Sequence, residues 1–409
     1  MYKKSIRFRL YGLKNLYFCI LGEGILQFST LQFSLNTMKR TFWLLVSMYL
    51  CSVSLIAQTT SGSDTITAIT TAVPFLTICP DAKSGALSEA GVAIADNANA
   101  IYWNPSILAF SQKKAGFAVN YTPWLRALNI PDINHGFIPG YLNLGEKGGV
   151  IGAAITYFSL GEIQFTNEQG QNIGSFNANE FAFSLAYSHK ITEHLAAGTA
   201  LRYIRSNLAG SMVTSMGSLQ PAQSIAGDMN VFYTKDFQIK SGGKALPMNF
   251  RFGMNISNIG AKVTYSNTAR KDFIPTNLKI GYALKANIDE YNAFTFTNDF
   301  NKLLVPSAGG QTQVPLMTGI FSSFSDRKFS EEVSEINVSL GAEYMYNNLF
   351  AVRAGYFYED PLKGGRKFIT LGAGLKFRVF TLDFAYLASL LQNHPLQNTL
   401  RFSLAFDFE

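Results

Sequence analysis

The sequence has few charged residues for its length. Only 15% of its 409 residues are charged, whereas 14% are aromatic, with 34 Phe and 34 Gly. An ordinary soluble domain carries about 25% charged residues. The composition therefore argues against a simple soluble enzyme. It also excludes a disordered chain, which would be rich in charge and poor in aromatic residues.

Net positive charge is almost absent outside the first part of the chain. Residues 1–57 hold seven Lys or Arg and one acid, and so carry +6 of the net charge of +7. Within them, Met38-Lys39-Arg40, the apolar run 41–56 and Ala57 have the layout of a secretory signal peptide. We therefore expect residues 1–57 to be an upstream extension plus a signal peptide, with translation starting at Met38. The alternative is an N-terminal membrane anchor, although run 41–56 is shorter than the ~20 residues of a span.

Other features of soluble enzymes are also missing. Only Cys79 of the three cysteines follows residue 57, so no internal disulfide can form there. No later run reaches the ~18 apolar residues of a transmembrane helix. The chain contains no GxSxG, Walker or CxxC motif, and its four His have no third ligand at zinc spacing. We expect no cofactor, no metal, no nucleic-acid partner and no catalytic activity.

What the sequence does contain is long alternation of apolar with small or polar residues. In the last strand, Leu400, Phe402 and Leu404 alternate with Arg401 and Ser403. Strands of about ten residues with this pattern are typical of membrane barrels, whereas the strands of soluble sandwiches are shorter. We predict an all-β fold, a 14-stranded antiparallel transmembrane β-barrel over 113–409 in the outer membrane. Its strands are expected near 113–122, 133–144, 148–158, 178–189, 194–206, 222–235, 247–258, 276–287, 290–301, 334–346, 349–359, 366–377, 379–388 and 397–409.

The predicted connections alternate in length. Those after even-numbered strands are tight, except for a moderate one around Gly242-Gly243, and those after odd-numbered strands are mostly longer. Bacterial barrels have short periplasmic turns and longer external loops. We therefore expect both ends of the barrel, and with them the N-terminal segment, on the periplasmic side. The long loops are expected at 159–177, 207–221, 259–275 and 302–333.

Residues 58–112 follow neither a strand pattern nor a linker composition. The stretch 84–97 is rich in Ala and Gly, and Trp103-Asn104-Pro105 follows it. Small residues let a segment pack closely inside a narrow lumen. We interpret 58–112 as an N-terminal periplasmic or plug segment folded into the barrel from below. The alternative is a periplasmic tail packed under the barrel.

Charged residues on the inward face form a second prediction. If Tyr346 faces Phe350 across the turn, Glu343 lies opposite Arg353, and we predict a lumen ion pair there; a one-residue slip would separate the two. The inward basic residues either pair with the plug and with each other or line an anionic solute path. They are Arg202, Arg251, Lys279, Lys285, Arg353, Lys376, Arg378 and Arg401, against Glu343, Asp383 and Asp407.

The predicted loops carry apolar residues that a solvent-exposed loop does not need. Such residues mark either a partner site or a folded-in cap. The candidate cargo-binding or partner-binding residues are Trp124, Leu125, Arg126, Leu304, Leu316 and Phe321.

Several of these motifs together resemble the PorV family, also called LptO. The similarity runs from about residue 70 to the end, with Cys79 standing where a small residue such as Ala is expected. The motifs are 74–78 (PFLTI), 81–86 (DAKSGA), 89–93 (EAGVA), Trp103-Asn104-Pro105, 121–128 (YTPWLRAL) and 364–374 (GGRKFITLGAG).

The resemblance implies a function. PorV-like proteins are barrels of the fatty-acid-transporter type in the type IX secretion system of the outer membrane. They bind the C-terminal signal domains of cargo proteins leaving the translocon barrel. They then shuttle the cargo to a cell-surface attachment complex, where a sortase-like partner links it to lipopolysaccharide. Two alternatives stay open, a hydrophobic-solute transporter and, less favoured, a lipopolysaccharide-modifying enzyme.

Overall fold

The computed structural model describes residues 68–409 except 129, 131, 167–168, 209, 211–212, 215–216, 242–243, 267–270, 308–313 and 393. All described residues belong to the unit Thr60–Glu409. The expected signal peptide, upstream extension and start at Met38 lie outside the described residues. Within the described part, no helix combines the length and the apolar character that a membrane span requires.

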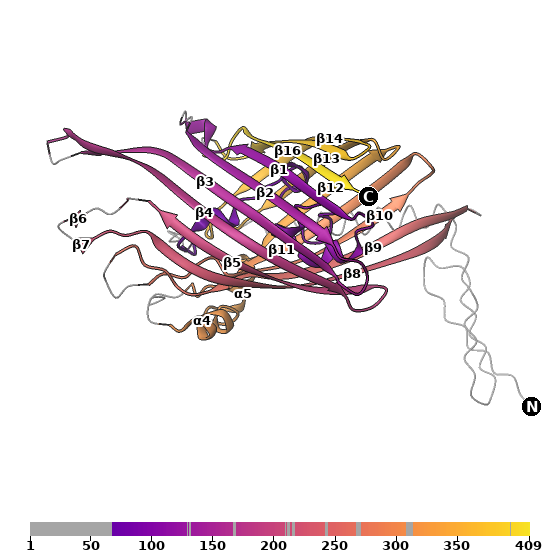
Figure 1. The fold of residues 1–409 in the computed structure, drawn as a ribbon, viewed down its shortest axis with the longest axis horizontal. Coiled ribbons are helices and arrows are strands. Elements are labelled where there is room, and N and C mark those ends of the chain that lie inside the picture. The colour runs from indigo at the N-terminus through magenta and orange to yellow at the C-terminus, as the bar shows by residue number, and fades with distance from the viewer. Residues whose placement is uncertain are drawn as a thin grey trace, which may run out of the picture. The chain divides into compact units, whose positions relative to one another are not determined.

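Fourteen antiparallel strands close into a barrel, because β16 pairs with β1 (Figure 1). Each strand pairs with its neighbour in sequence, except that a small hairpin separates β5 from β8. The fold class predicted from the alternation is therefore confirmed. The strands are β1 (Ala115–Pro123), β2 (Ile133–Asn143), β3 (Val150–Thr166), β4 (Asn172–Lys190), β5 (Leu195–Asn207), β8 (Ala222–Ser241), β9 (Lys244–Gly260), β10 (Asn277–Asn287), β11 (Asn292–Leu303), β12 (Asn337–Tyr346), β13 (Phe350–Tyr358), β14 (Lys367–Phe377), β15 (Phe380–Ser389) and β16 (Thr399–Phe408).

The alternation has the expected physical basis. In β1, Phe117, Val119 and Tyr121 are exposed on the outside, while Ala118 and Asn120 are buried on the inside. Successive side chains of a strand point to opposite faces. Large apolar groups therefore cover the outer surface, and small or polar groups leave room in the lumen for another segment of the chain.

Two connections differ from the prediction. The expected loop 159–177 is mostly strand, since β3 continues to Thr166 and β4 starts at Asn172. The β3–β4 ladder shifts register between Ser159 and Glu162, beside Gly161 with φ +78°. It then continues into the part that had been expected to be a loop. The moderate connection expected around Gly242-Gly243 is shorter than predicted, since β8 ends at Ser241 and β9 starts at Lys244. Gly242 and Gly243 lie outside the described residues.

Short turns collect at one end of the barrel and longer loops at the other. Three residues, 347–349, join β12 to β13, and Asn347 and Asn348 among them have left-handed φ of 52° and 50°, which Asn adopts more readily than most residues. The long-loop end carries η3 (Arg126–Leu128), the hairpin of β6 (Val213–Thr214) and β7 (Gly217–Ser218), α4 (Leu316–Ser322) and α5 (Phe329–Ser334). Figure 1 shows β6, β7, α4 and α5 on one side of the view.

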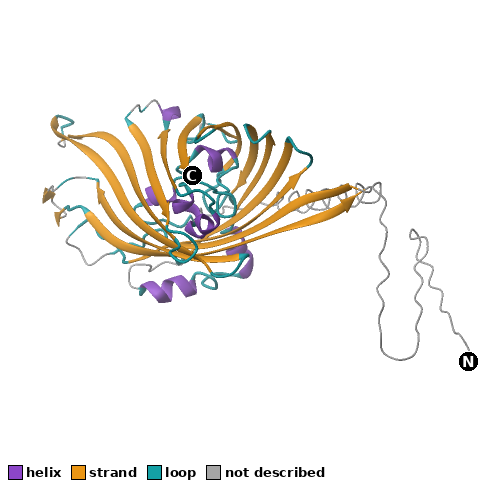
Figure 2. Ribbon diagram, turned by 45° about the vertical axis from the view of Figure 1, so that its right-hand side comes forward, coloured by secondary structure: helices purple, strands orange, loops and turns teal. Residues whose placement is uncertain are grey.

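The segment before β1 lies inside the ring of strands (Figure 2). We call its described part, 68–112, the hatch; it contains η1 (Pro74–Thr77), α2 (Ala82–Ala86), α3 (Ala100–Trp103) and η2 (Pro105–Phe110). Helix α2 contacts β13 to β16, and η2 contacts β3, β4, β5 and β8. The interior position is that of a plug rather than of a tail under the barrel.

The direction of the hatch differs from the expectation of entry from below. Ala72 N donates to the carbonyl of Phe273, 2.9 Å away, in the long loop before β10. At the other end of the hatch, Lys114 N donates to Phe408 O at 2.8 Å, next to the last residue of the chain. The described hatch thus runs from the long-loop end through the lumen to the short-turn end.

Candidate functional site

Glycines in the barrel wall let the hatch backbone touch the strands. Gly253 of β9 lies opposite Gly281 of β10. A Cβ at Gly253 would overlap the Val92 carbonyl, and one at Gly281 would overlap the Asp299 carboxylate. That carboxylate accepts hydrogen bonds from Gly91 N (2.7 Å) and Val92 N (3.0 Å). The hatch turn at Val92 therefore packs directly against Gly253 and Gly281, a pair that we call the glycine seat.

Trp103 forms the buried centre of the hatch. Its indole Nε1 donates to Asp81 Oδ1 at 2.6 Å, and the Lys279 Nζ of the wall lies 4.2 Å from its ring. The next residue, Asn104, donates to the carbonyls of Val92 and Val231. Burial raises the pKa of Asp81, although N–H groups of the hatch oppose this effect. The Trp-Asn-Pro motif thus ties the hatch to itself and to the wall.

The predicted lumen pair is present in the structure. Glu343 lies opposite Arg353, and Arg353 Nε is 2.6 Å from Glu343 Oε2. Arg353 Nη1 also donates to Asp383 Oδ1 at 2.6 Å, which the hairpin argument did not anticipate. One guanidinium therefore joins strands β12, β13 and β15 through two carboxylates.

Two of the other inward basic residues form ion pairs. Arg202 pairs with Asp228 at 2.9 Å and Arg401 with Glu89 of the hatch at 2.9 Å. Arg378 differs from the prediction: it is exposed in the turn after β14, with its guanidinium 5.3 Å from the Phe377 ring. It takes the left-handed φ of 53° because it forms the corner after the last ladder pair, so it does not face the lumen.

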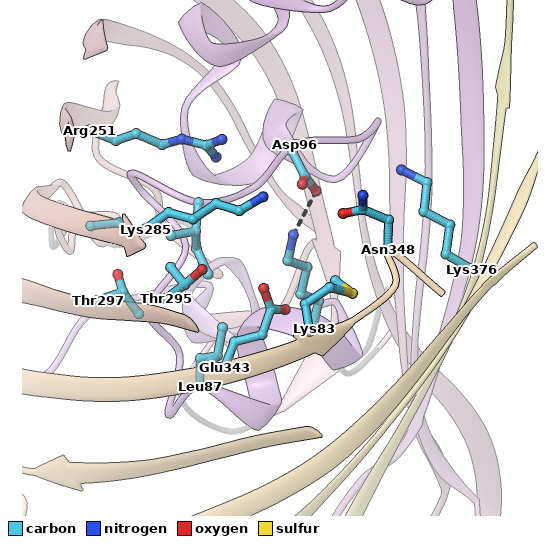
Figure 3. A pocket seen from close by; sticks show the side chains of 13 residues that line it. Lys83, Leu87, Asp96, Arg251, Lys285, Thr295, Thr297, Glu343, Asn348 and Lys376 are labelled. Carbon is cyan, nitrogen blue, oxygen red and sulfur yellow. Dashed lines mark hydrogen bonds and ion pairs between the residues drawn. The ribbon is translucent and has the colours of Figure 1, made fainter. Parts of the chain in front are cut away.

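Three remaining cations line a cavity of about 150 Å³ at the short-turn end, shown in Figure 3. They are Arg251, Lys285 and Lys376. Lys83 of the hatch also lines it and pairs with Asp96 at 2.7 Å. Burial acts to raise the pKa of Asp96, but Lys83, Arg251 and Lys376 together outweigh it and lower this pKa.

The six candidate loop residues do not form one patch. Trp124 and Leu125 are partly buried against Phe357 and Phe368. Leu304 is 2% exposed, with its backbone N bonded to Thr276 O, so it lies in the interior and not on a binding surface. Arg126 is exposed and Leu316 is half-buried. Of the six, only Phe321 is a large apolar side chain that is mostly exposed, at 69%.

Phe321 belongs to an exposed apolar surface on two short helices, which we call the α4–α5 face. Met317 and Phe321 are four residues apart and so lie on one side of α4, and Phe324, 49% exposed, follows in the turn after this helix. Phe329, 84% exposed, and Val333 repeat this spacing in α5. Sequence reasoning missed Phe324, Phe329 and Val333, although their helical spacing was a readable signal.

Buried ion pairs hold the base of this face. Lys302 Nζ lies 2.8 Å from Glu332 Oε2 and 2.6 Å from Glu335 Oε2. Lys363 of the next long loop pairs with Glu335 at 2.9 Å. Because all four side chains are buried, these bonds fix α5 to β11 and to the loop before β14.

No group of His, Cys, Asp and Glu among the described residues could hold a metal ion. Cys79 is buried in the hatch, and burial raises the pKa of its thiol well above the ordinary value.

Comparison with solved structures gives weak likenesses to other outer-membrane barrels. The toluene transporter TodX of Pseudomonas putida has 12% identity and a TM-score of 0.45, covering 80% of this chain and 98% of TodX. The toluene transporter TbuX of Ralstonia pickettii has 11% identity and a TM-score of 0.42, with the same coverage of both chains. A FadL homologue of Pseudomonas aeruginosa has 11% identity and a TM-score of 0.38, covering 81% of this chain and 98% of the homologue. No curated protein matches the chain.

A family model gives the stronger result. The model for the type IX secretion system protein PorV matches residues 61–309, which is more than half of the chain. The match includes the hatch and the strands that form its glycine seat. The chain therefore belongs to the PorV family, and is an outer-membrane barrel protein of the type IX secretion system that works with other components of that system.

Proposed function

We propose that this barrel binds the C-terminal signal domains of secreted cargo proteins at its long-loop end. It carries them from the translocon barrel to a sortase-like attachment protein, which links them to lipopolysaccharide. The barrel itself is not the catalyst of that attachment. Family membership supports the pathway, and the exposed α4–α5 face supports the place of binding.

The α4–α5 face has the chemistry of a protein-binding surface. Its large apolar side chains are exposed on two consecutive elements of one long loop, and exposed apolar patches on folded proteins mark interaction sites. Aromatic side chains and Met are enriched at protein interfaces. In an outer-membrane barrel the long loops face the cell exterior, which is where cargo arrives.

The anchor beneath the face adds to this argument. The ion pairs of Lys302 and Lys363 hold α5 in one position before any partner arrives. A surface that is already ordered loses less entropy on binding than a mobile loop does. We therefore expect the face to dock cargo largely as a preformed unit.

The test is a binding measurement with the full chain in detergent and a purified cargo signal domain. We expect F321D and F329D each to weaken binding by about 30-fold or more, which is the loss of affinity typical of substituting a hot-spot residue. The barrel should still fold, as shown by its heat-dependent migration on a gel. I191D is the matched control, because Ile191 is an exposed apolar residue in a short turn at the other end. Unchanged cargo binding by both α4–α5 variants would contradict the proposal.

A hydrophobic-solute transporter is the alternative function, and it requires an apolar pocket in the lumen. The lumen cavity at the short-turn end is instead lined by several charged side chains. Uptake of a long-chain fatty acid by cells with and without the protein separates the two functions. Loss of uptake together with normal secretion would favour the transporter.

A further inference from the structure

The cavity at the short-turn end holds more cationic than anionic groups. Lys83, Arg251, Lys285 and Lys376 line it, and Asp96 and Glu343 are its only acidic lining residues among those described. We call it the cation cavity. It lies at the opposite end of the barrel from the α4–α5 face, so its argument does not rest on the proposed function.

Both acids of the cation cavity are already engaged. Asp96 bonds to Lys83 at 2.7 Å, and Glu343 bonds to Arg353 at 2.6 Å. Arg251 Nε donates to Asn249, which leaves the rest of its guanidinium free for a ligand. Within the described part of the chain, the side chains of Lys285 and Lys376 make no hydrogen bond or ion pair; only the backbone of these lysines is bonded, as in Lys376 N to Leu349 O at 2.7 Å. Arg251, Lys285 and Lys376 thus form no direct ion pair among the described residues, and share the more distant charges of Asp96 and Glu343, each of which is already bonded to another cation.

These groups come from separate elements and converge on one space. Figure 3 shows Arg251 and Lys285 extending toward Asp96 from one side and Lys376 from the other. They are carried by β9, β10 and β14. The uncharged donors Thr295, Thr297 and Asn348 also line the cavity, together with four apolar residues. Clefts lined by charge of one sign, with low-dielectric walls, concentrate the field on an ion of opposite sign.

We propose that the cation cavity binds a phosphate-type oxyanion. A phosphate group has several strong acceptor oxygens, which suits an arginine fork and two lysine point charges around one space. Hydroxyl and amide donors can bind the remaining oxygens. The group is either free in the periplasm or carried on a phospholipid headgroup at the short-turn end.

The test is a titration of the full chain in detergent with inorganic phosphate, against chloride at equal ionic strength. Saturable binding by calorimetry is expected for the unaltered protein. K285Q and K376Q should each weaken it by about tenfold, the effect of losing one charge-assisted hydrogen bond. K147Q should bind normally, because Lys147 is exposed in a turn at the same end but does not line the cavity.

A competition experiment distinguishes the two sources of phosphate. Displacement of bound phosphate by vesicles containing phosphatidylglycerol, but not by phosphatidylcholine vesicles, identifies a lipid headgroup. Phosphate binding that such vesicles leave unchanged identifies a free anion. The proposal is overturned if phosphate does not bind saturably at millimolar concentration, or if K147Q loses binding as much as K285Q does.

Discussion

At the scale of single residues, the lumen is stabilised by a few fully partnered charges. Arg353 lies between Glu343 and Asp383, each 2.6 Å away, and all three are buried. Removing one partner of a buried pair leaves an uncompensated charge, which costs more than the pair gains. The loss of stability caused by each substitution can therefore be ranked by the number of buried charges that it leaves without a partner.

We expect R353M to lower the free energy of unfolding by about 3–5 kcal/mol, because it removes the guanidinium that is hydrogen-bonded to two buried carboxylates. E343Q should cost about 1–3 kcal/mol, since Arg353 keeps Asp383. Urea unfolding of the detergent-solubilised barrel measures both. K113M is the control: Lys113 pairs with Glu409 on the surface, and its loss should leave the unfolding midpoint unchanged. A smaller cost for R353M than for E343Q would contradict this account.

Cys79 makes the position of the hatch measurable. It is the only cysteine after residue 57 and is 1% exposed. Burial raises the pKa of its thiol, so at pH 8 the folded protein holds less reactive thiolate than an ordinary cysteine would. We expect maleimide to label the processed protein slowly at pH 8 and quickly after unfolding. Fast labelling of the folded barrel at this pH would show that the hatch does not hold the described position.

At the scale of elements, the hatch and the wall fit through the glycine seat. The Val92 carbonyl occupies the space that a side chain at Gly253 would need, and a carbonyl cannot rotate away as a side chain can. We expect G253A to lower the free energy of unfolding by about 1–3 kcal/mol, the usual cost of overpacking. It should also speed the labelling of Cys79.

Gly136 provides the matched control for that substitution. It is also in a strand, but a Cβ there would lie 3.9 Å from its nearest neighbour, Tyr157 O. G136A should therefore leave both the unfolding midpoint and the labelling rate unchanged. Equal effects of G136A and G253A would indicate that alanine perturbs the strands in general and that the seat has no special role.

The strands could be predicted from the sequence because the lipid imposes a simple rule. Positions that face the lipid must be apolar, and this pattern marks the strands in the sequence. The predicted bounds of β12 to β16 therefore lie within three residues of the observed bounds. The rule fails where a strand leaves the membrane. The outer part of β3 and the first residues of β4, such as Asn172 and Gly174, form a ladder through backbone bonds alone and therefore resemble a loop.

The candidate site was only partly predictable. Glu343 and Arg353 could be paired because a tight turn fixes the register of a hairpin. The hydrogen bond that Arg401 donates to Glu89 joins residues 312 positions apart, and no local sequence pattern specifies it. The same limit explains Leu304: its apolar character was visible in the sequence, but its burial was not.

At the scale of the whole barrel, the two ends carry different chemistry. The long-loop end presents the apolar α4–α5 face on a base of buried ion pairs. The short-turn end holds the cation cavity. Between them the hatch lies in the lumen, tied to the wall by hydrogen bonds with Asp299, Asn255 and Arg401. This arrangement suits a carrier that binds partners at its surface better than an open pore.

The most direct test of the central claim is to delete the gene and fractionate the cells. If the barrel carries cargo of the type IX system, secreted proteins should accumulate in the periplasm with their C-terminal signal domains still attached. Restoring the gene should reverse the defect, whereas restoring it with F321D and F329D together should not. Normal secretion and surface attachment of cargo in the deletion strain would contradict the account.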